Sequence, residues 1–159
     1  MAQEGAFTIA FMWEIVSRGG LIVGYNVTDD VAIDLHLGAV PHVVTHGVTA
    51  RIRIEDGIDN DEHVLVGLTR MSSSRPGREQ PWVTGLNLGY RYELGADGDA
   101  GTYPLEIGIC PILHRPTSGT NEVAATEYKP PFTMFLGAGA QWSSEEVPEG
   151  QEQNAKKGE

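Results

Sequence analysis

Apolar and polar residues alternate along several blocks of about ten residues, and this period of two constrains the fold more than any other feature of the chain. In the segment VAIDLHLG, Ile33, Leu35 and Leu37 alternate with Asp34 and His36. Successive side chains of a β-strand point to opposite faces, so each block predicts a strand with one apolar and one polar face. Twenty glycines and nine prolines, scattered without a repeat, indicate many turns between the blocks. The chain is therefore predicted to be all-β.

Eight blocks carry a strand pattern, and short connectors separate most of them. The predicted strands are 7–17, 20–28, 31–40, 46–55, 62–71, 81–94, 102–113 and 131–142. A length of 159 residues suits one domain, and eight strands joined in succession predict an antiparallel up-and-down barrel over 1–142. The segment 143–159 has few apolar residues and holds five Glu against two Lys, which predicts a disordered acidic tail.

Charge and composition exclude several classes of protein. The formal net charge is −11, which argues against nucleic acid as a partner because phosphate binding requires a basic surface. Cys110 is the single cysteine, so the chain has neither an internal disulfide nor a cysteine metal cluster. No apolar run approaches the roughly 20 residues of a membrane-spanning helix.

The alternation leaves open which face of the barrel is the inside. In a soluble lipocalin-like barrel the apolar rows line a cavity for an apolar small molecule, whereas in a membrane barrel they face lipid. A soluble β-sandwich is a third alternative. The first residues, MAQEGAF, lack the charged and apolar regions of a signal peptide, which favours the soluble alternatives. The lipocalin-type combination of an early Gly-x-Trp and a later Thr-Asp-Tyr is absent.

Aromatic residues on the apolar face gather near the two ends of the threaded strands. Near the end that holds the chain start lie Phe7, Tyr25, Tyr90, Tyr92, Tyr103 and Trp142, and near the other end lie Trp13, Trp82 and Phe132. The ten steps from Phe132 to Trp142 span about 33 Å along a strand, or roughly 25 Å of height when the strand is tilted. Two aromatic belts at this separation are typical of a membrane barrel and its lipid interfaces.

The connectors divide in the same way between the two ends. TDD, DGIDND and GADGDAG, at the end of the chain start, are short and acidic. The connectors at the other end are longer on average, and they carry Arg18, His42, His46, Arg75, Arg78, His114 and Arg115. Short turns on one side and longer loops on the other are typical of membrane barrels. Basic loops would contact the phosphates of lipopolysaccharide. Loop length, loop charge and aromatic placement together favour the membrane barrel.

With these features the chain resembles the small eight-stranded outer-membrane barrels of the OmpA-like and OmpX-like group. GYNVTDDVAIDLHLG looks like their hairpins with a short acidic turn, and LGYRYEL and LGAGAQW look like their later strands. The terminal aromatic of that family is matched by Trp142, although 17 residues follow it here. The resemblance implies a bacterial outer-membrane location, with the signal peptide already removed. It also implies contact with the lipid bilayer and lipopolysaccharide, and a role for the upper loops in envelope stabilisation, surface contact or adhesion.

If the apolar face meets lipid, the polar face fills the interior, because eight strands leave room only for side chains. Opposite charges there must pair, since an unpaired buried ion is costly. The predicted interior polar network comprises Glu14, Asp34, His36, Arg51, Arg53, Arg91, Glu93 and Glu106. The same face also holds Asn26, Thr49, Glu55, Asn87, Gln141, Met12, Leu65 and Phe135. A salt-bridged plug is expected, and a gated ion path is the alternative.

Neither a metal site nor catalysis is predicted, and no cofactor is expected. His42, His46 and His114 come from the upper connectors, but loop histidines without a fixed third ligand do not define a zinc site. A lesser alternative is an outer-membrane hydrolase that modifies lipid A, because His114, Ser118 and Glu122 supply the residue types of a Ser–His–acid group. They match no motif of those enzymes.

Overall fold

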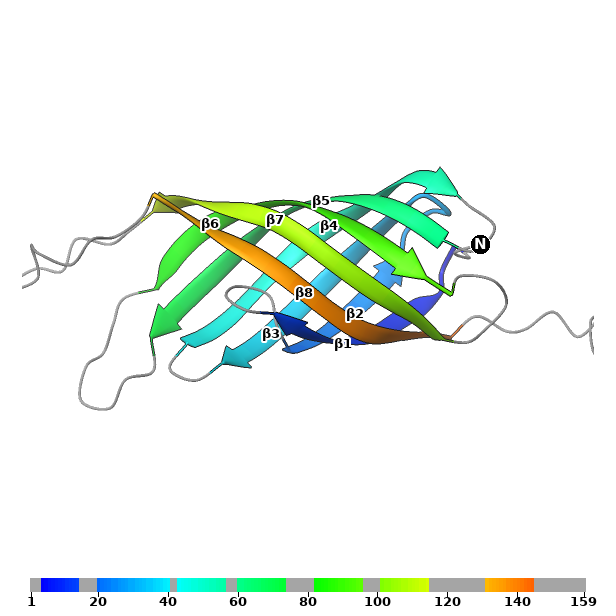
Figure 1. Cartoon of the computed structure of the whole chain (residues 1–159), viewed down its shortest axis with the longest axis horizontal. Coiled ribbons are helices and arrows are strands. Elements are labelled where there is room, and N and C mark those ends of the chain that lie inside the picture. The colour runs from blue at the N-terminus through cyan, green and yellow to red at the C-terminus, as the bar shows by residue number, and fades with distance from the viewer. Residues whose placement is uncertain are drawn as a thin grey trace, which may run out of the picture.

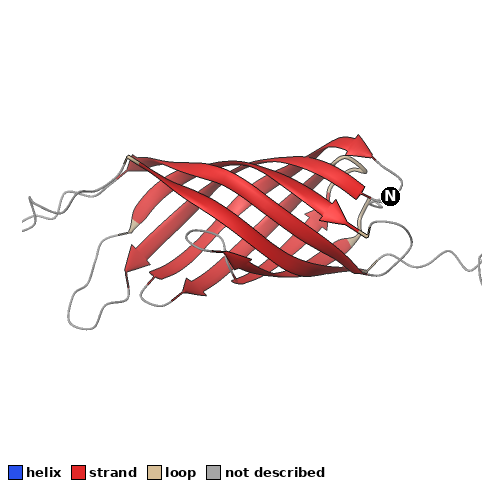
Figure 2. Ribbon diagram, viewed as in Figure 1, coloured by secondary structure: helices blue, strands red, loops and turns tan. Residues whose placement is uncertain are grey.

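A closed barrel of eight strands makes up the part of the chain that the computed structural model describes, residues 4–14, 20–40, 43–56, 60–73, 82–95, 101–114 and 131–144. The strands are β1 (Phe7–Glu14), β2 (Gly20–Asn26), β3 (Val31–Val40), β4 (Val43–Asp56), β5 (Asn60–Ser73), β6 (Val83–Leu94), β7 (Gly101–His114) and β8 (Phe132–Ser143). Each strand pairs antiparallel with the next and β8 pairs with β1, which closes the barrel (Figures 1 and 2). The prediction of an all-β, eight-stranded antiparallel up-and-down barrel is confirmed. No helix in the described part of the chain has the length and hydropathy needed to cross a membrane.

Several strands are longer than the sequence pattern indicated. β4 begins at Val43, three residues before the predicted start at residue 46. The pairing of β3 with β4 continues to Val40 opposite Val43, and it keeps these residues in the sheet. The expected connector at 56–61 is shortened in the same way, because β5 already begins at Asn60.

The first and last strands close the barrel through backbone pairing that runs slightly past the predicted boundary at 142. Thr8 lies opposite Ser143, and the Ser144 N–H donates to the Phe7 carbonyl oxygen over 2.8 Å. The Phe7 N–H in turn donates to Ser144 Oγ at 3.0 Å. The barrel therefore includes Ser143 and Ser144, and residues 145–159 of the expected tail lie outside the described residues.

The connections at the two ends of the barrel differ in average length, and we call these ends the turn end and the loop end. At the turn end, on the right of Figure 1, the strands are joined by residues 27–30, 57–59 and 95–100. At the loop end, on the left, they are joined by residues 15–19, 41–42, 74–82 and 115–131. The Thr28 hydroxyl accepts hydrogen bonds from the Asp30 and Val31 N–H groups at 3.2 and 3.1 Å, which fixes the first turn.

The barrel has its apolar rows on the outside. In β3, Leu35 and Leu37 are 59% and 61% exposed, whereas Asp34 and His36 are 1% and 3% exposed. The same alternation runs along β2, β6, β7 and β8, where large apolar side chains are exposed and polar ones are buried. The lipocalin-like alternative is therefore wrong, because the aliphatic rows of the described strands lie on the outside of the barrel. The sandwich alternative is wrong because the sheet closes on itself.

The loop-end half of the interior is filled by a mainly apolar layer. Phe135 of β8 is 1% exposed and reaches across to the backbones of Gly89 and Gly108. A Cβ on Gly108 would lie 2.3 Å from Phe135 Cζ, so only glycine leaves room for the ring. Met12 and Leu65 are buried in the same interior, at 1% and 0% exposure. The inward positions of Phe135, Met12 and Leu65 agree with the alternation of the sequence.

Replacing Gly85 by alanine is expected to destabilise the barrel by about 1–3 kcal/mol, as overpacking of a filled core does. A Cβ at this position would lie 2.3 Å from Cys110 Sγ and 3.2 Å from the Pro111 carbonyl oxygen. Because the closer contact is to a side chain, the double variant G85A/C110A should recover most of the lost stability. Urea titration in detergent micelles, followed by tryptophan fluorescence, measures both variants. A double variant as unstable as G85A would contradict this account of the contact.

Candidate functional site

The turn-end half of the interior holds a network of ion pairs around Arg91 of β6. The Arg91 side chain is fully buried, and its Nε lies 2.8 Å from Glu93 Oε1. Its Nη1 lies 3.3 Å from Glu106 Oε1, and its Nη2 donates a hydrogen bond to Gln141 Oε1 over 2.5 Å. The register produces the second contact, since Arg91 lies directly opposite Glu106 in the pairing of β6 with β7. Each carboxylate thus has a cation within reach, as burial requires.

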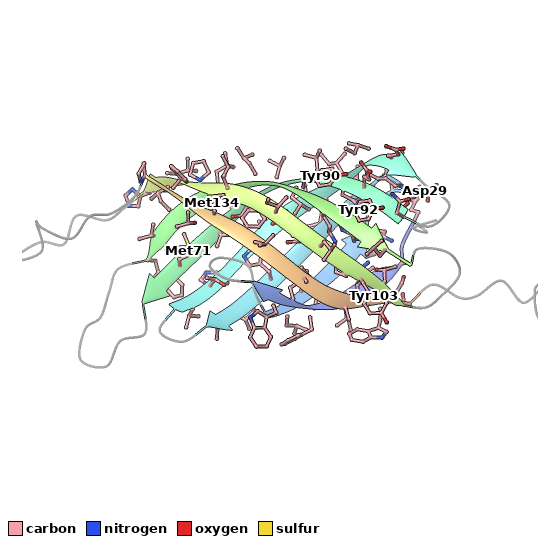
Figure 3. The ribbon with its side chains drawn as sticks, viewed as in Figure 1. Asp29, Met71, Tyr90, Tyr92, Tyr103 and Met134 are labelled. Carbon is pink, nitrogen blue, oxygen red and sulfur yellow. The ribbon has the colours of Figure 1, made fainter. Side chains whose placement is uncertain are left out.

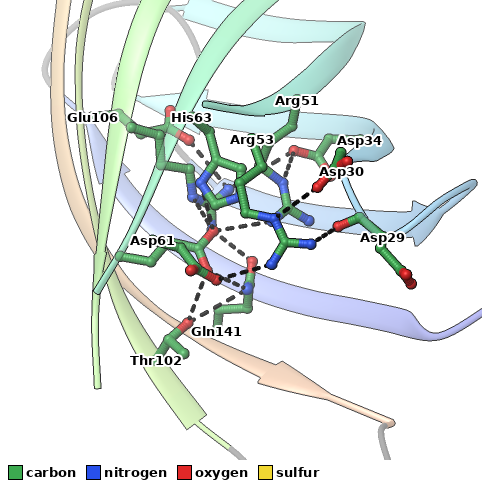
Figure 4. Close-up of polar contacts among 12 residues, drawn as sticks. Asp29, Asp30, Asp34, Arg51, Arg53, Asp61, His63, Thr102, Glu106 and Gln141 are labelled. Carbon is green, nitrogen blue, oxygen red and sulfur yellow. Dashed lines mark hydrogen bonds and ion pairs between the residues drawn. The ribbon is translucent and has the colours of Figure 1, made fainter. Parts of the chain in front are cut away.

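Arg51 of β4 extends the network across the barrel. Its Nε donates to Asp34 Oδ2 at 3.3 Å, and its Nη1 donates to Glu93 Oε1 at 3.0 Å. Glu93 is therefore shared by two arginines, and Asp34 Oδ2 also lies 3.8 Å from Arg91 Nη1. Charges of opposite sign alternate along this path, and Figure 4 shows the side chains meeting inside the barrel.

Neutral groups complete the hydrogen bonding of Glu93, and sequence reasoning assigned them no such role. Gln141 Nε2 donates to Glu93 Oε2 at 3.2 Å, and Thr102 Oγ1 donates to the same oxygen at 3.4 Å. Gln141 was expected on the inward face, whereas Thr102 was not singled out. Thr102 follows the same period of two as the inward Glu106, and the register places it opposite Gln141.

Arg53 lies at the mouth of the barrel rather than in the central network. Its Nε is 3.3 Å from Asp30 Oδ1, and its Nη2 donates to the Asp29 carbonyl oxygen. Its Nη1 is 3.9 Å from Asp61 Oδ2. Arg53 thus connects the turn at 27–30 to the strands β4 and β5, as Figure 4 shows.

Two further inward groups, Asp61 and His63, were missing from the predicted network. They are 6% and 3% exposed, and His63 Nδ1 lies 3.9 Å from Glu93 Oε1. Asp61 had been assigned to a connector, so its alternation with Glu62 was not counted. The period of two through Asp61, His63 and Leu65 is the signal that could have found both.

His36, another member of the predicted set, contacts neutral groups in the described part of the interior. His36 Nε2 lies 3.1 Å from Thr69 Oγ1, and Asn87 Nδ2 donates a hydrogen bond to the same hydroxyl. These neutral groups form a second polar layer. Glu14 pairs through its backbone with Gly137, and its side chain lies outside the described residues.

Glu55 was expected to face inward, and that prediction is wrong, because its side chain is exposed. The pairing of β4 with β5 shifts between Arg53 and Glu55, where Arg53 lies opposite His63 and Glu55 opposite Glu62. A β-bulge adds one unpaired residue to a strand, so the alternation of faces changes beyond it. Glu55 therefore moves to the outer surface.

The structure places the nine predicted interface aromatics on the outer side of the wall. At the turn end, Phe7 and Tyr25 have ring centroids 5.0 Å apart. Figure 3 shows Tyr90, Tyr92 and Tyr103 toward that same end. Exposure is 55% for Phe7, 43% for Tyr25, 64% for Tyr103, 54% for Trp142, 81% for Trp13 and 48% for Phe132. Trp82 is half-buried and precedes β6, although the sequence had placed it within a strand.

Metal ligands and catalytic groups are not brought together in the described residues. No cluster of three His, Cys, Asp or Glu side chains arranged for a metal occurs among them. His46 lies on β4 and His114 ends β7. His42, Ser118 and Glu122 lie outside the described residues, so the Ser–His–acid group of the lesser alternative is not placed by the structure.

An aliphatic exterior around a buried ionic interior, in a sheet closed on itself, defines a β-barrel of the membrane type. The structure is similar to the crystal structure of the N-terminal β-barrel domain of Pseudomonas aeruginosa OprF, with a TM-score of 0.65 and 14% sequence identity. The alignment covers 89% of this chain and 99% of that domain, so the likeness concerns the whole barrel fold. No protein-family model and no curated protein sequence matches the chain.

Proposed function

We propose that this chain is a small bacterial outer-membrane barrel that acts through its loop end in envelope stabilisation or surface contact. One observation carries the proposal: charged groups such as Arg91 and Glu106 are buried inside a wall whose outer side chains are aliphatic. A protein in water would gain nothing from this arrangement, whereas lipid requires it, because a bilayer solvates aliphatic side chains and excludes ions.

The filled interior favours a structural wall over a channel. Arg91 and Phe135, both at most 1% exposed, occupy the turn-end and loop-end halves of the lumen. Eight strands leave an interior only wide enough for side chains. The work of the protein then falls to the connections at the loop end, which include the spans 74–82 and 115–131. No catalytic step is part of this proposal.

Refolding from urea tests the membrane assignment. With detergent micelles, we expect β-structure by circular dichroism and a gel mobility that differs between unheated and boiled samples. Without micelles neither signal should develop, because the aliphatic wall would face water. In planar bilayers the refolded chain should give no stable current steps. A folded, soluble monomer in plain buffer would contradict the membrane assignment, and stable conductance would contradict the filled interior.

Shortening the span 116–129 to a Gly-Ser linker tests the role of the loop end. The variant should keep the heat-dependent mobility, because all eight strands are retained. The host is a Gram-negative strain whose envelope excludes hydrophobic dye only when the full chain is expressed. Cells that express the shortened variant should take up as much dye as cells that carry the empty vector. Full protection by the shortened chain would contradict a role for this loop.

A further inference from the structure

A row of polar side chains crosses the outer surface of the barrel near its loop end. The register places His46 of β4 opposite Arg70 of β5, Arg70 opposite Thr84 of β6, and Thr84 opposite His114 of β7. Side chains directly opposite each other share one face, with Cβ atoms about 5 Å apart. Arg70 is exposed and follows the outward Leu68 by two positions, so the row lies on the outside of the wall.

Trp82 organises the centre of this row. The Arg70 guanidinium carbon lies 5.8 Å from the centroid of the Trp82 ring, within the range of a cation–π contact. The ring of His46 meets Trp82 edge-on, with centroids 4.7 Å apart and an interplanar angle of 66°. One aromatic side chain thus contacts the side chains of both Arg70 and His46, which brings two groups of nitrogen donors together on the outer surface.

Within the described residues, Arg70 lacks the carboxylate partner that the interior arginines have. Arg51, Arg53 and Arg91 each lie within ion-pair distance of Asp or Glu. Among the described residues, no carboxylate comes within 4.0 Å of Arg70, and its guanidinium instead lies over the Trp82 ring. A cation on a lipid-facing wall is costly without a counter-ion.

The position of Arg70 along its strand points to the source of that counter-ion. It lies just beyond the apolar residues Val66 and Leu68, and β5 ends three residues later at Ser73. This is the level at which an apolar band gives way to lipid headgroups. At the turn end the same outward row of β5 carries Glu62 in place of a cation. The outward row of β5 is therefore polarised, with an acid at the turn end and a cation at the loop end.

We propose that Arg70, His46 and Trp82, with His114 beside them, bind the phosphate group of a bilayer lipid in the leaflet at the loop end. The planar guanidinium offers paired N–H donors that match two phosphate oxygens, and each imidazole adds a further donor. The indole packs at the same interface level. This inference rests on the proposed function, because it requires the wall to lie in a bilayer.

The test identifies the lipids that stay bound to the full chain after it has been refolded into vesicles. The vesicles consist of phosphatidylcholine, with or without a minor fraction of phosphatidic acid, whose headgroup is a phosphate monoester. Mild detergent extraction followed by native mass spectrometry counts the lipids that remain bound. Wild type should retain phosphatidic acid in preference to phosphatidylcholine. R70Q should lower this preference about tenfold, the factor expected for the loss of one charge-assisted contact. R70K should keep part of it, because the charge remains.

The matched control is E62Q, at the opposite end of the same outward row, which should leave the preference unchanged. Since the chain carries a net charge of −11, general electrostatics disfavours anionic lipid, and enrichment must come from a local site. Equal preference in wild type and R70Q would overturn the proposal. So would displacement of phosphatidic acid by dissolved inorganic phosphate, which would indicate an unspecific anion site. Failure of the membrane assignment itself would look different from these two outcomes, because wild type would then show no heat-dependent gel mobility in any vesicle.

Discussion

Replacing Arg91 by methionine is expected to lower the free energy of unfolding in detergent micelles by about 3–5 kcal/mol, because it removes one partner of a buried ion-pair network. Methionine keeps much of the side-chain length but has no charge. Glu106 loses a contact of 3.3 Å and Glu93 loses one of 2.8 Å, and both carboxylates stay buried. Urea titration, followed by the gel mobility of unheated samples, measures the change in the free energy of unfolding.

Two further variants separate the lost charge pairing from lost packing. R91M/E106Q removes the carboxylate charge that R91M leaves behind, so the double variant should be more stable than R91M alone. R70M makes the same substitution on the outer wall, where none of the described carboxylates pairs with Arg70, and should cost far less in micelles. If R91M proved no more destabilising than R70M, the interior ion pairs would not hold the barrel together.

The alternation of the sequence was enough to divide most side chains between two faces, because a strand has only two faces. Asp34 and Leu35 illustrate this: their separation onto opposite faces needed no knowledge of neighbouring strands, whereas the choice of the interior face needed the aromatic belts and the connectors of the whole barrel. The same holds for Phe135, whose inward position follows from the period of two in β8 even though its chemistry suits lipid.

The partners of each inward residue could not be predicted, because they depend on register and on depth within the barrel. Arg51 and Arg53 look equivalent in the sequence, yet Arg51 reaches Glu93 in the interior and Arg53 reaches Asp30 at the mouth. Glu55 shows a second limit. A bulge is a matter of pairing between two strands, so a pattern read along one strand does not reveal it.

Replacing Leu35 by arginine is expected to lower the stability of the barrel in phosphatidylcholine vesicles by about 2–4 kcal/mol, the cost of a cation near the bilayer midplane. Leu35 is 59% exposed, lies in the middle of β3 and has Val23 and Val48 as its cross-strand neighbours. Urea titration of the vesicle-embedded chain measures the change.

The matched control is L94R, at the turn end of β6, where the leucine is 42% exposed. Near the interface the same substitution should cost only about 0–1 kcal/mol, because the side chain can reach water. This depth dependence distinguishes lipid from water as the solvent of the wall. On a water-facing wall, arginine would be tolerated equally at both positions, so equal effects of L35R and L94R would contradict the membrane assignment. A larger effect at Leu35 would place the aliphatic band of β3 inside the bilayer, with Asp34 turned toward the arginines of the interior.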